Sequence, residues 1–451
     1  MSIPLFTGKT VLVMGLGRFG GGLDAAKFAH NRGAKVIITD LAKGEKLGDS
    51  LNQLKEFGDI EYHLGGHNKA DFKEADIIIV NPAVSPDNEF LKFARRHNKF
   101  ITAAVNIFFE LSPAKIIAIT GANGKSTTAA LTAHLLENTS HKNVRLSGNI
   151  GNEPLLADID KIAADDLVVL ELSSFQTEQL AQIKKAPGVA LLTNLTPNHL
   201  DRHGSFANYC AAKENIFKFQ KLDENHPSIS IFGADDKVGR EWFEKYSIQQ
   251  GRVCIRFSAD DVTDEIRSNF TLPGRANLLN LAAAIAVAEV FGVTDEQIKA
   301  SLPKFKPLPH RLEPVAEING IRWYNDSIAT TPASAIAALE AFDEPKIIIA
   351  GGYDKNLPFD ELGETIAQTA KAAILIGTTA QKIASAIKNA NRSNTKIEFA
   401  DSLADAVDIA KCLAISGDIV LLSPACASYD MFDNFQQRST EFVKLVHQIS
   451  E

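Results

Sequence analysis

Residues 121–128 of this 451-residue chain, GANGKSTT, combine the groups that bind nucleotide phosphates. Gly121 and Gly124 allow backbone N–H groups to turn toward an anion, and Lys125 supplies a positive charge for the β- and γ-phosphates. A hydroxyl from Ser126 or Thr127 can bind Mg²⁺. The apolar run before the loop and the helical pattern after it predict a strand–loop–helix unit, in which the helix N-terminus faces the anion. The first glycine of the common GxxxxGK[ST] pattern is missing, and the structural alternative is a solvated turn with a surface lysine.

A second glycine-rich segment, VLVMGLGRFGGG, lies near the N-terminus. Gly15, Gly17 and Gly20 follow a predicted strand and precede a predicted helix, and Asp40 ends the next strand 20 residues after Gly20. This is the GxGxxG pattern of dinucleotide-binding folds, in which the glycines admit a phosphate and the acid binds a ribose. Three interpretations stay open: a nicotinamide or flavin cofactor, another nucleotide-like ligand, and glycines that serve packing alone.

Three further side chains could act at the phosphate-binding loop. Glu171 ends a predicted strand, at the edge where open α/β sheets bind ligands, and its carboxylate can hold Mg²⁺. His199 follows the next strand and can be a second metal ligand. Lys213 lies in a predicted helix. From residue type alone, the alternatives are a buried paired acid, a structural histidine and a surface lysine.

The elements expected to position these residues are short buried strands that alternate with helices. Apolar runs bounded by Gly, Pro, Asn or Asp are typical of strands buried on both faces of a parallel sheet. Stretches such as 129–137 and 333–340 have apolar residues at helical spacing and predict helices. The alternation predicts an α/β fold. The predicted strands are 11–14, 36–39, 77–80, 116–120, 168–172, 190–194, 347–350, 373–376 and 419–422.

Composition and charge exclude several classes of protein. Hydrophobic residues make up 45% and charged residues 23% of the chain, which is ordinary for a globular protein and not for a disordered or fibrous one. A net charge of −8 without blocks of like charge argues against nucleic-acid binding. The four cysteines form no CxxC or zinc spacing, which indicates a reducing, cytoplasmic compartment. No apolar run reaches the roughly 20 residues that span a membrane, and the N-terminus does not resemble a signal peptide.

Two segments predict domain boundaries. A new strand and the phosphate-binding loop begin after 102–113, and three prolines in LPKFKPLPH, at 302–310, disfavour a helix there. The prediction is three α/β domains of ordinary size, 1–103, 104–308 and 309–451.

Eight segments of the sequence, taken together, resemble the Mur ligase family. The phosphate-binding loop matches the form TGxNGK[ST]T, which this family shares with folylpolyglutamate synthases. The other segments follow in the family's order through the second and third predicted domains, and the first glycine loop with VNPAVSPDN, at 80–88, resembles the family's N-terminal domain. The eight segments are TGANGKSTT, LSGNIGNEPLL, LELSSFQTEQL, LTNLTPNHLDRHGSFANYCAAKENIF, LPHRLEPV, YNDSIATT, GGYDKNLPF and LLSPACASYDMFDNFQQR.

The sequence is most similar to the branch of the family that joins glutamate to UDP-N-acetylmuramoyl-L-alanine in peptidoglycan precursor synthesis. The resemblance implies ATP as phosphate donor, two Mg²⁺ sites and an acyl phosphate that the amine of D-glutamate attacks. It implies a Rossmann-like N-terminal domain that binds the UDP-sugar instead of NAD, a central P-loop ATPase-type domain with a parallel sheet, and a Rossmann-like C-terminal domain for the amino acid. It also implies a monomer with small-molecule partners only.

Matching the family's motifs residue by residue implies specific roles. The implied catalytic residues are Lys125, His199 and Lys213, and Lys213 carries a carbamate made from CO₂. The implied metal ligands are Ser126, Glu171, His199 and Lys213. The implied ATP-binding residues are Gly121, Asn123, Gly124, Lys125, Ser126, Thr127, Asn277, Asn280, Arg311 and Asp326. The implied UDP-sugar-binding residues are Gly15, Gly17, Arg18, Phe19, Asp40, Asn81, Ser85, Asn149, Gly151, Ser173 and Gln176. The implied amino-acid-binding residues are Thr330, Lys355, Ser428, Tyr429 and Phe435.

The sequence departs from the family's patterns at five positions. Ala83, Asn198 and Ala276 replace a glycine, an aspartate and a histidine. Ile328 and Thr331 replace the lysine and the second asparagine of NDSKATN, near the place where the acyl intermediate meets glutamate. L-Glutamate therefore stays open as an alternative to D-glutamate.

Three other classes of function are alternatives. An NAD(P)-dependent oxidoreductase would use the first glycine loop, but would leave the second loop and the C-terminal segments unexplained. Another Mur or folate-type ligase would be separated by a panel of substrates. A nucleotide-sugar-binding protein without catalysis would be expected to lack Lys125, Glu171, His199 or Lys213, and all four are present.

Overall fold

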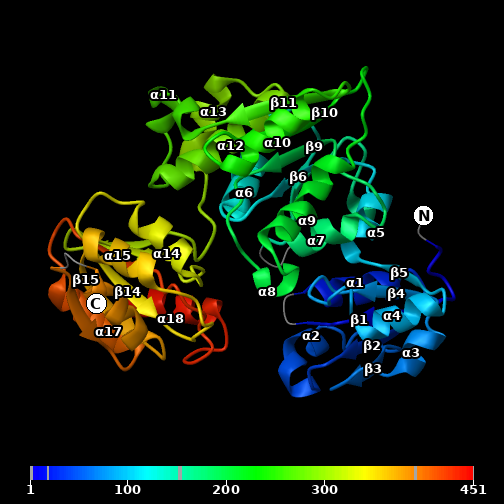
Figure 1. The fold of residues 1–451 in the computed structure, drawn as a ribbon, viewed down its shortest axis with the longest axis horizontal. Helices are drawn as coiled ribbons and strands as arrows, with labels where there is room; N and C mark the ends of the chain where they lie inside the picture. Colours follow the sequence, from blue (N-terminus) through cyan, green and yellow to red (C-terminus); the bar gives the residue numbers. More distant parts are fainter. Residues whose placement is uncertain (1–3, 18–19, 151–154, 391–393, 450–451) are drawn as a thin grey trace. The chain divides into compact units, whose positions relative to one another are not determined.

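The computed structural model of this chain describes residues 4–17, 20–150, 155–390 and 394–449. They form two compact units: Met1–Asp261 with Leu279–Ser301, and Val262–Leu278 with Leu302–Glu451. Figure 1 shows three sheets flanked by helices, two in the first unit and one in the second. The three-domain α/β class predicted from the sequence is confirmed, and the exact domain boundaries stay a prediction.

The N-terminal part folds as a parallel sheet with helices on both faces. Its elements are β1 (Thr10–Met14), α1 (Gly21–Asn31), β2 (Lys35–Asp40), α2 (Gly48–Asn52), β3 (Glu61–Leu64), α3 (Lys69–Glu74), β4 (Ile77–Val80), α4 (Glu89–Arg96), β5 (Phe100–Thr102) and α5 (Ala104–Leu111). The strand order is β3-β2-β1-β4-β5. Val11 and Val13 of β1 pack with α1, whereas Leu12 and Met14 pack with α3 and α4. Burial of both faces explains why this strand is apolar throughout.

The central part contains a second parallel sheet. Its elements are β6 (Lys115–Thr120), α6 (Lys125–Leu136), β7 (Val144–Gly148), β8 (Leu167–Glu171), α7 (Ser174–Leu180), β9 (Val189–Leu192), α8 (Leu200–His203), α9 (Phe206–Lys218), β10 (Ser228–Gly233), α10 (Lys237–Ser247), β11 (Arg252–Phe257), α12 (Arg275–Val290) and α13 (Asp295–Ser301). The strand order is β11-β10-β9-β6-β8-β7. Because β6 lies between β9 and β8, the loops that follow these three strands meet at one sheet edge.

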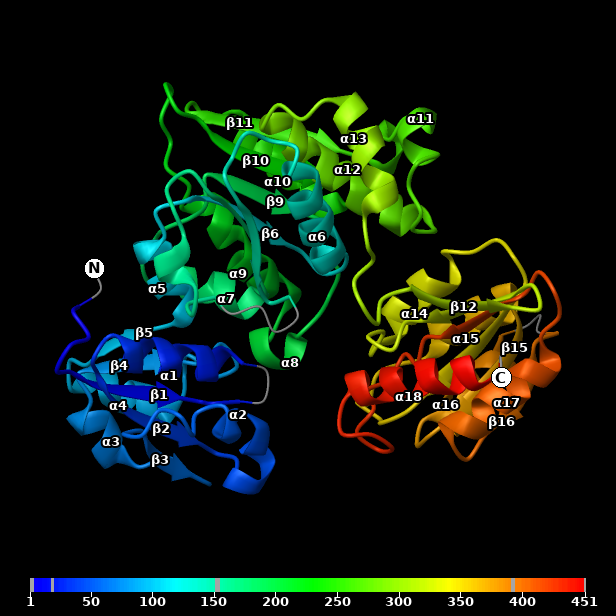
Figure 2. The same ribbon diagram turned by 180° about the vertical axis from the view of Figure 1, so that it is seen from behind.

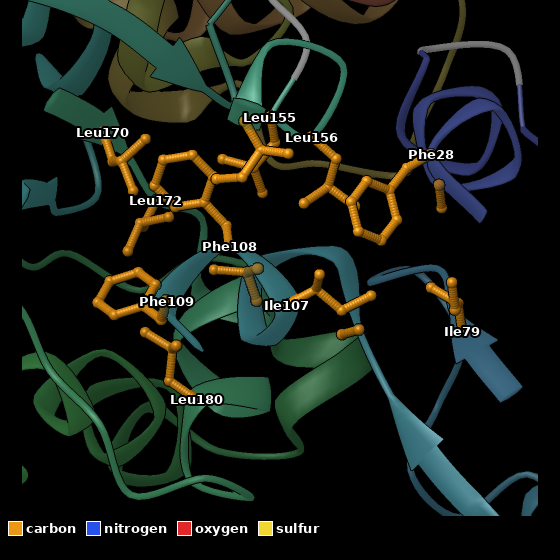
Figure 3. Close-up of a cluster of buried hydrophobic side chains, with 14 of the residues drawn as sticks. Phe28, Ile79, Ile107, Phe108, Phe109, Leu155, Leu156, Leu170, Leu172 and Leu180 are labelled. Atoms are coloured by element: carbon orange, nitrogen blue, oxygen red, sulfur yellow. The ribbon is translucent and has the colours of Figure 1, made fainter. Parts of the chain in front are cut away.

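The N-terminal and central parts share a buried joint within the first unit. Phe28 of α1 packs with Leu155 and Leu156 of the central part (Figure 3). Asp24 of α1 accepts hydrogen bonds from the backbone N–H groups of Leu155, Leu156 and Ala157 at 3.0, 2.7 and 2.8 Å. Burial nevertheless raises the pKa of this carboxyl. The carboxylate thus fixes the helix after the first glycine loop to the central part.

The second unit is built on a mostly parallel sheet. Its elements are α11 (Asp264–Arg267), β12 (Glu313–Ile318), β13 (Ile321–Asn325), α14 (Pro332–Leu339), β14 (Lys346–Gly351), α15 (Asp360–Thr369), β15 (Ala370–Ile376), α16 (Ala380–Asn389), β16 (Lys396–Phe399), α17 (Leu403–Leu413), β17 (Ile419–Leu422) and α18 (Phe435–Gln448). The strand order is β12-β13-β17-β14-β15-β16, with only β12 and β13 antiparallel among the pairs. Helices α14, α15 and α16 cover one face, and α17 and α18 cover the other (Figure 2).

All nine predicted strands are present, and the strands that the sequence did not predict are mostly at sheet edges. β3, β11 and β16 are edge strands with several exposed or half-buried residues, so they lack a continuous apolar run. β10 is inside its sheet, but its serines interrupt the pattern. In the part of the chain that the structure describes, no helix has the length and apolar character needed to cross a membrane.

Candidate active site

The phosphate-binding loop joins β6 to α6, as predicted, and two of its positions require glycine. Gly121 has a φ of 153° and Gly124 a φ of 80°. A Cβ atom at Gly121 would lie 1.9 Å from Thr193 Oγ1, and one at Gly124 would lie 2.1 Å from Asn280 Oδ1. Asn280, which the resemblance assigns to ATP, therefore lies directly against the loop, and it also accepts a hydrogen bond from Thr128 Oγ1 at 3.3 Å.

The loop after β9 holds the phosphate-binding loop in shape. The carbonyl of Asn123 accepts hydrogen bonds from Thr193 Oγ1 at 2.7 Å and Asn194 Nδ2 at 3.1 Å. The Asn123 N–H donates to Asn194 Oδ1 at 3.0 Å. Lys125 Nζ donates to the Ala122 carbonyl at 2.9 Å, so its ammonium lies over the loop. Ser126 and Thr127 follow in the first turn of α6, and Thr127 is buried.

A buried amine lies behind this loop. Lys213 of α9 is 2% exposed, and its Nζ donates to Thr120 Oγ1 at 3.1 Å. The Thr120 hydroxyl donates in turn to the Leu172 carbonyl at 2.7 Å. Burial, and then the charge of Lys125, lower the pKa of Lys213 well below its ordinary value, while Glu171 acts in the opposite direction. Lys213 is therefore not a surface lysine, which its residue type alone had favoured.

Glu171 brings a buried carboxylate to the end of β8. It is 1% exposed, and its Oε1 accepts a hydrogen bond from Asn149 Nδ2 at 3.3 Å. Its Oε2 is buried and has no hydrogen-bond partner among the described residues. A buried carboxylate oxygen without a donor is costly, and a divalent cation would compensate it. The donor set at this edge therefore fits Mg²⁺.

His199 lies farther out. Its side chain is exposed, and its backbone has a left-handed φ of 51° at the N-cap of α8. The His199 ring lies 5.2 Å from the Phe175 ring, between centroids. Within the described ranges, no three His, Cys, Asp or Glu side chains gather as a metal site. The structure thus brings Lys125, Glu171 and Lys213 together by electrostatic interaction, and leaves His199 on a separate exposed turn.

The first glycine loop is held by Asp40 and Asn81. Gly15 and Gly17 have φ values of 89° and 66°. Asp40 Oδ2 accepts from the Gly17 N–H at 3.1 Å, and its Oδ1 accepts from the Ala42 N–H at 2.8 Å. Asn81 Nδ2 donates to the Gly15 carbonyl at 3.2 Å. These four predicted residues are therefore neighbours. Arg18, Phe19 and Gly151 lie outside the described residues.

Ser173 and Gln176, assigned to the UDP-sugar, form the capping box of α7. Ser173 N–H donates to Gln176 Oε1 at 2.9 Å, and Gln176 N–H donates to Ser173 Oγ at 3.3 Å. Their side chains therefore have a structural use at the N-terminus of the helix. Ser85 is exposed, and its Oγ accepts from the Asp87 N–H at 3.3 Å.

In the second unit, Arg311 lies on a strained turn beside Asp326, which follows β13. His310 and Leu312, on either side of Arg311, have φ values of 68° and 40°. Asp326 accepts from Ser423 Oγ at 2.8 Å and from the Leu312 N–H at 3.2 Å. Burial raises the pKa of Asp326 to about 7, although Arg311 lowers it. Arg311 Nε is buried and has no hydrogen-bond partner among the described residues.

Asn277 also belongs to the second unit. Its Nδ2 donates to the Pro273 carbonyl at 2.7 Å, and its N–H donates to the Gly274 carbonyl at 3.1 Å. It therefore closes the turn before α12. It lies inside α12, which begins at Arg275, so it is not the N-cap residue of this helix.

The residues assigned to the amino acid come from loops around β13, β14 and β17. Ser428 is 2% exposed, and its Oγ has no hydrogen-bond partner in the described part of the chain. Lys355 and Tyr429 are exposed. The Phe435 ring lies 5.8 Å from the His310 ring, and Thr330 is half-buried in the turn after β13.

Sequence reasoning missed Arg438, a buried guanidinium on α18. Arg438 is 1% exposed, and burial lowers its pKa to about 10. Its Nε donates to Ser327 Oγ at 3.0 Å, its Nη2 to the Ser327 carbonyl at 2.8 Å and its Nη1 to the Cys426 carbonyl at 3.2 Å. Arg438 therefore connects the loop after β13 to the loop after β17, and both loops contain residues predicted to bind substrates. Its place as the last residue of the FQQR segment was the available signal.

Three family models match this chain, one after another. The Mur ligase MurD-like N-terminal domain matches residues 9–103, the Mur ligase middle domain matches 119–288, and the Mur ligase glutamate ligase domain matches 310–426. The UDP-N-acetylmuramoylalanine--D-glutamate ligase of Acidobacterium capsulatum is 38% identical, over 97% of this chain and 96% of the relative. The enzyme of the same name from Roseiflexus sp. is 38% identical, over 97% and 98%.

Solved structures agree at the level of the fold. The UDP-N-acetylmuramate-alanine ligase MurC of Thermotoga maritima matches with a TM-score of 0.61 and 19% identity, over 98% of this chain and 100% of that one. A pseudomurein peptide ligase type C of Methanothermus fervidus matches with a TM-score of 0.57 and 17% identity, over the same shares of the two chains.

Proposed function

Because the chain belongs to the Mur ligase family, we propose that it joins D-glutamate to UDP-N-acetylmuramoyl-L-alanine with ATP, forming ADP and phosphate, in peptidoglycan synthesis. The observation that carries the proposal is the preformed phosphate-binding loop backed by buried Lys213 and Glu171. An NAD(P)-dependent oxidoreductase would not require this phosphate-binding loop with its buried lysine and glutamate. The relatives of the stated activity cover nearly the whole chain, including the loops of the second unit.

The reaction needs activation of a carboxylate, because hydroxide is a poor leaving group. The free carboxylate of UDP-N-acetylmuramoyl-L-alanine attacks the γ-phosphorus of ATP, and the bond to the ADP oxygen breaks. The glutamate amine then adds to the acyl phosphate, and the tetrahedral intermediate loses phosphate and a proton to leave the amide. Positioning and neutralisation of charge by Lys125 and the loop N–H groups are the main tasks of the protein.

The residues that would hold Mg²⁺ are Glu171 and a hydroxyl at the start of α6, Ser126, with His199 and Lys213 proposed for a second ion. Bound Mg²⁺ would neutralise the phosphates and reduce repulsion between ATP and the anionic substrate. The unpartnered Glu171 Oε2 supports the first of these sites.

We also propose that Lys213 carries a carbamate. Its lowered pKa favours the neutral amine, which is the form that reacts with CO₂, and the product would give an anionic oxygen where the structure buries this amine near Glu171. Purified protein in carbon-13 bicarbonate should show a carbamate NMR signal that Lys213→Ala removes. Lys213→Ala should lose turnover and regain part of it with acetate. An active Ala variant without that signal would contradict the carbamate.

The remaining assignments are proposals of the same kind. The N-terminal domain, 1–103, would bind UDP at Gly15, Gly17, Asp40 and Asn81. The central domain, 104–308, would bind ATP, and Asn277, Arg311 and Asp326 are also proposed as ATP-binding residues. The C-terminal domain, 309–451, would bind glutamate, and the buried, unpartnered Ser428 Oγ supports this. We propose a monomer, which sedimentation would test.

Release of ADP tests the function directly. Purified protein receives UDP-N-acetylmuramoyl-L-alanine, ATP and Mg²⁺, with D-glutamate or L-glutamate in parallel. Turnover with D-glutamate is expected, and shows that Ile328 and Thr331 are tolerated. Turnover with L-glutamate alone would identify the chain as the alternative, L-glutamate-adding ligase. Ile328→Lys and Thr331→Asn would then be the first variants to test. Silence with both amino acids would contradict the proposal.

A further inference from the structure

Arg202 links the exposed turn that carries His199 to the N-terminal domain. Its side chain is 16% exposed, and its Nη2 donates to the Val84 carbonyl at 3.2 Å and to Glu178 Oε2 at 3.2 Å. Val84 lies in the loop after β4, Glu178 in α7, and Arg202 in α8. One side chain therefore joins three segments that are distant in sequence but belong to one compact unit.

The hydrogen bonds continue from Val84 to the first glycine loop. The Val84 N–H donates to the Asn81 carbonyl at 3.0 Å, which closes a turn. Asn81 Nδ2 then donates to the Gly15 carbonyl at 3.2 Å. Gln179 of α7 donates to the Val80 carbonyl at 3.3 Å, one residue before Asn81. The turn formed by residues 81–84 is thus held from one side by Gly15 and from the other by α7 and α8.

The aromatic side of the same linkage leads to His199. The Arg202 guanidinium carbon lies 5.4 Å from the centre of the Phe175 ring. The same ring lies 5.2 Å from the His199 ring and 5.6 Å from the His203 ring. His203 Nε2 pairs with Ser174 Oγ at 3.0 Å, which anchors α8 to the start of α7. Arg202 and His199 therefore share one aromatic support.

We propose that Arg202 is a positioning residue that sets the distance between the bound UDP-sugar and the phosphate-binding loop. The inference rests on the proposed function. Arg202 acts through the 81–84 turn and the Phe175 support. The free carboxylate of the substrate must reach the γ-phosphate of ATP while the UDP group stays in the N-terminal domain. An arginine that fixes the 81–84 turn to α7 and to the turn that carries His199 sets that span, and a small misplacement of reacting groups costs about 10²-fold in rate.

The test compares two arginines of the first unit with the same kinds of partner. Arg145 also pairs with one carboxylate, Asp166 at 2.9 Å, and one backbone carbonyl, Lys161 at 2.8 Å. Arg202→Met and Arg145→Met both keep apolar length and remove the donors. Steady-state kinetics should give, for Arg202→Met only, a KM for the UDP-sugar about tenfold higher, a kcat about tenfold lower and an ATP KM within about twofold.

Arg202→Lys keeps the charge and one donor direction, so it should recover part of the loss. Should Arg202→Met fail to fold, Arg202→Lys serves as the test. A larger rise in its KM for the UDP-sugar than in its KM for ATP would then support the inference. Equal rises in both KM values, or the same pattern in Arg145→Met, would overturn the inference and leave Arg202 a structural residue.

Failure of the proposed function would look different, because wild-type protein would then release no ADP. In that case calorimetry with UDP-N-acetylmuramoyl-L-alanine alone still tests Arg202. An affinity about tenfold weaker in Arg202→Met than in Arg145→Met would support its role at the UDP-sugar loop, and equal affinities would refute it.

Discussion

The two glycine loops of this chain share one backbone plan but have different surroundings. Each helix begins after a left-handed glycine, Gly20 at a φ of 87° and Gly124 at 80°, and neither cap has a side-chain hydrogen bond. A Cβ atom at Gly20 would meet nothing within 4 Å, whereas one at Gly124 would lie 2.1 Å from Asn280 Oδ1. The first loop is held by a carboxylate, Asp40, and the second has a lysine, Lys125, over it.

This difference shows that a glycine pattern identifies a loop shape and leaves the chemistry to its neighbours. A loop braced by an acid can hold a ligand that stays intact. A loop with an ammonium and buried polar walls can stabilise the charge that moves during phosphoryl transfer. The same pattern therefore supports binding in one domain and catalysis in the other.

The largest effect is expected from removing the cation at the second loop. Lys125→Met should lower kcat about 10³-fold, because the ammonium would no longer stabilise the transferring phosphate. Lys27→Met is the matched control, since Lys27 lies in α1, the helix after the first loop, and its Nζ donates to Gln53 Oε1 at 3.4 Å. Equal ADP release from Lys125→Met and wild type would place the catalytic charge elsewhere.

The next effect separates the two glycines. Gly20→Ala should cost about 1–2 kcal/mol for the left-handed backbone alone. Gly124→Ala should cost about 1–3 kcal/mol more, because its Cβ would meet Asn280. Urea denaturation measures both, and Asn280→Ala in the Gly124→Ala background should return the additional part. Identical losses at Gly20 and Gly124 would remove the difference in packing on which the comparison depends.

A third prediction concerns pH and only the second loop. The pKa of Lys213 is lowered in the folded state, so between that value and the ordinary pKa of about 10.4 the unfolded chain binds one more proton. Stability then rises with pH, by up to about 1.4 kcal/mol per pH unit. In buffer free of CO₂, unfolding between about pH 8 and 10 should show this slope in wild type and lose it in Lys213→Met. A slope that survives in Lys213→Met comes from another group.

The smallest effect is expected at the first loop. Asp40→Asn leaves one acceptor for two N–H groups, so the KM for the UDP-sugar should rise about fivefold with the ATP KM unchanged. A fall in the UDP-sugar KM would mean instead that the Asp40 charge repels the diphosphate. In that case the charge of Asp40 would weaken ligand binding, whereas the charge of Lys125 favours its ligand.

The sequence predicted the strands that are buried on both faces, because their apolar runs are unbroken. It missed edge strands such as β3 and β16, whose exposed positions hide the pattern. It also predicted the residues of both glycine loops, since these obey local spacing. The Ser173–Gln176 capping box has a sequence signature, S-x-x-Q, that could have been recognised.

Other features of the site depend on distant pairings. The burial of Lys213 requires β6 and α9 to be side by side, and no local pattern separates it from an exposed helix lysine. Asp24 and Arg202 act on residues 131 and 118 positions away in sequence. Such contacts are fixed by the tertiary fold, which a single sequence does not reveal.

The hold of Asp24 on three consecutive amides has a consequence for protein engineering. The N-terminal domain cannot be exchanged between relatives as an independent unit, because α1 depends on a segment of the central part. A graft that replaces α1 and omits Leu155–Ala157 would leave three N–H groups without their acceptor, two of them buried. A working chimaera must take α1 and Leu155–Ala157 from the same parent protein, although more than a hundred residues separate them in sequence.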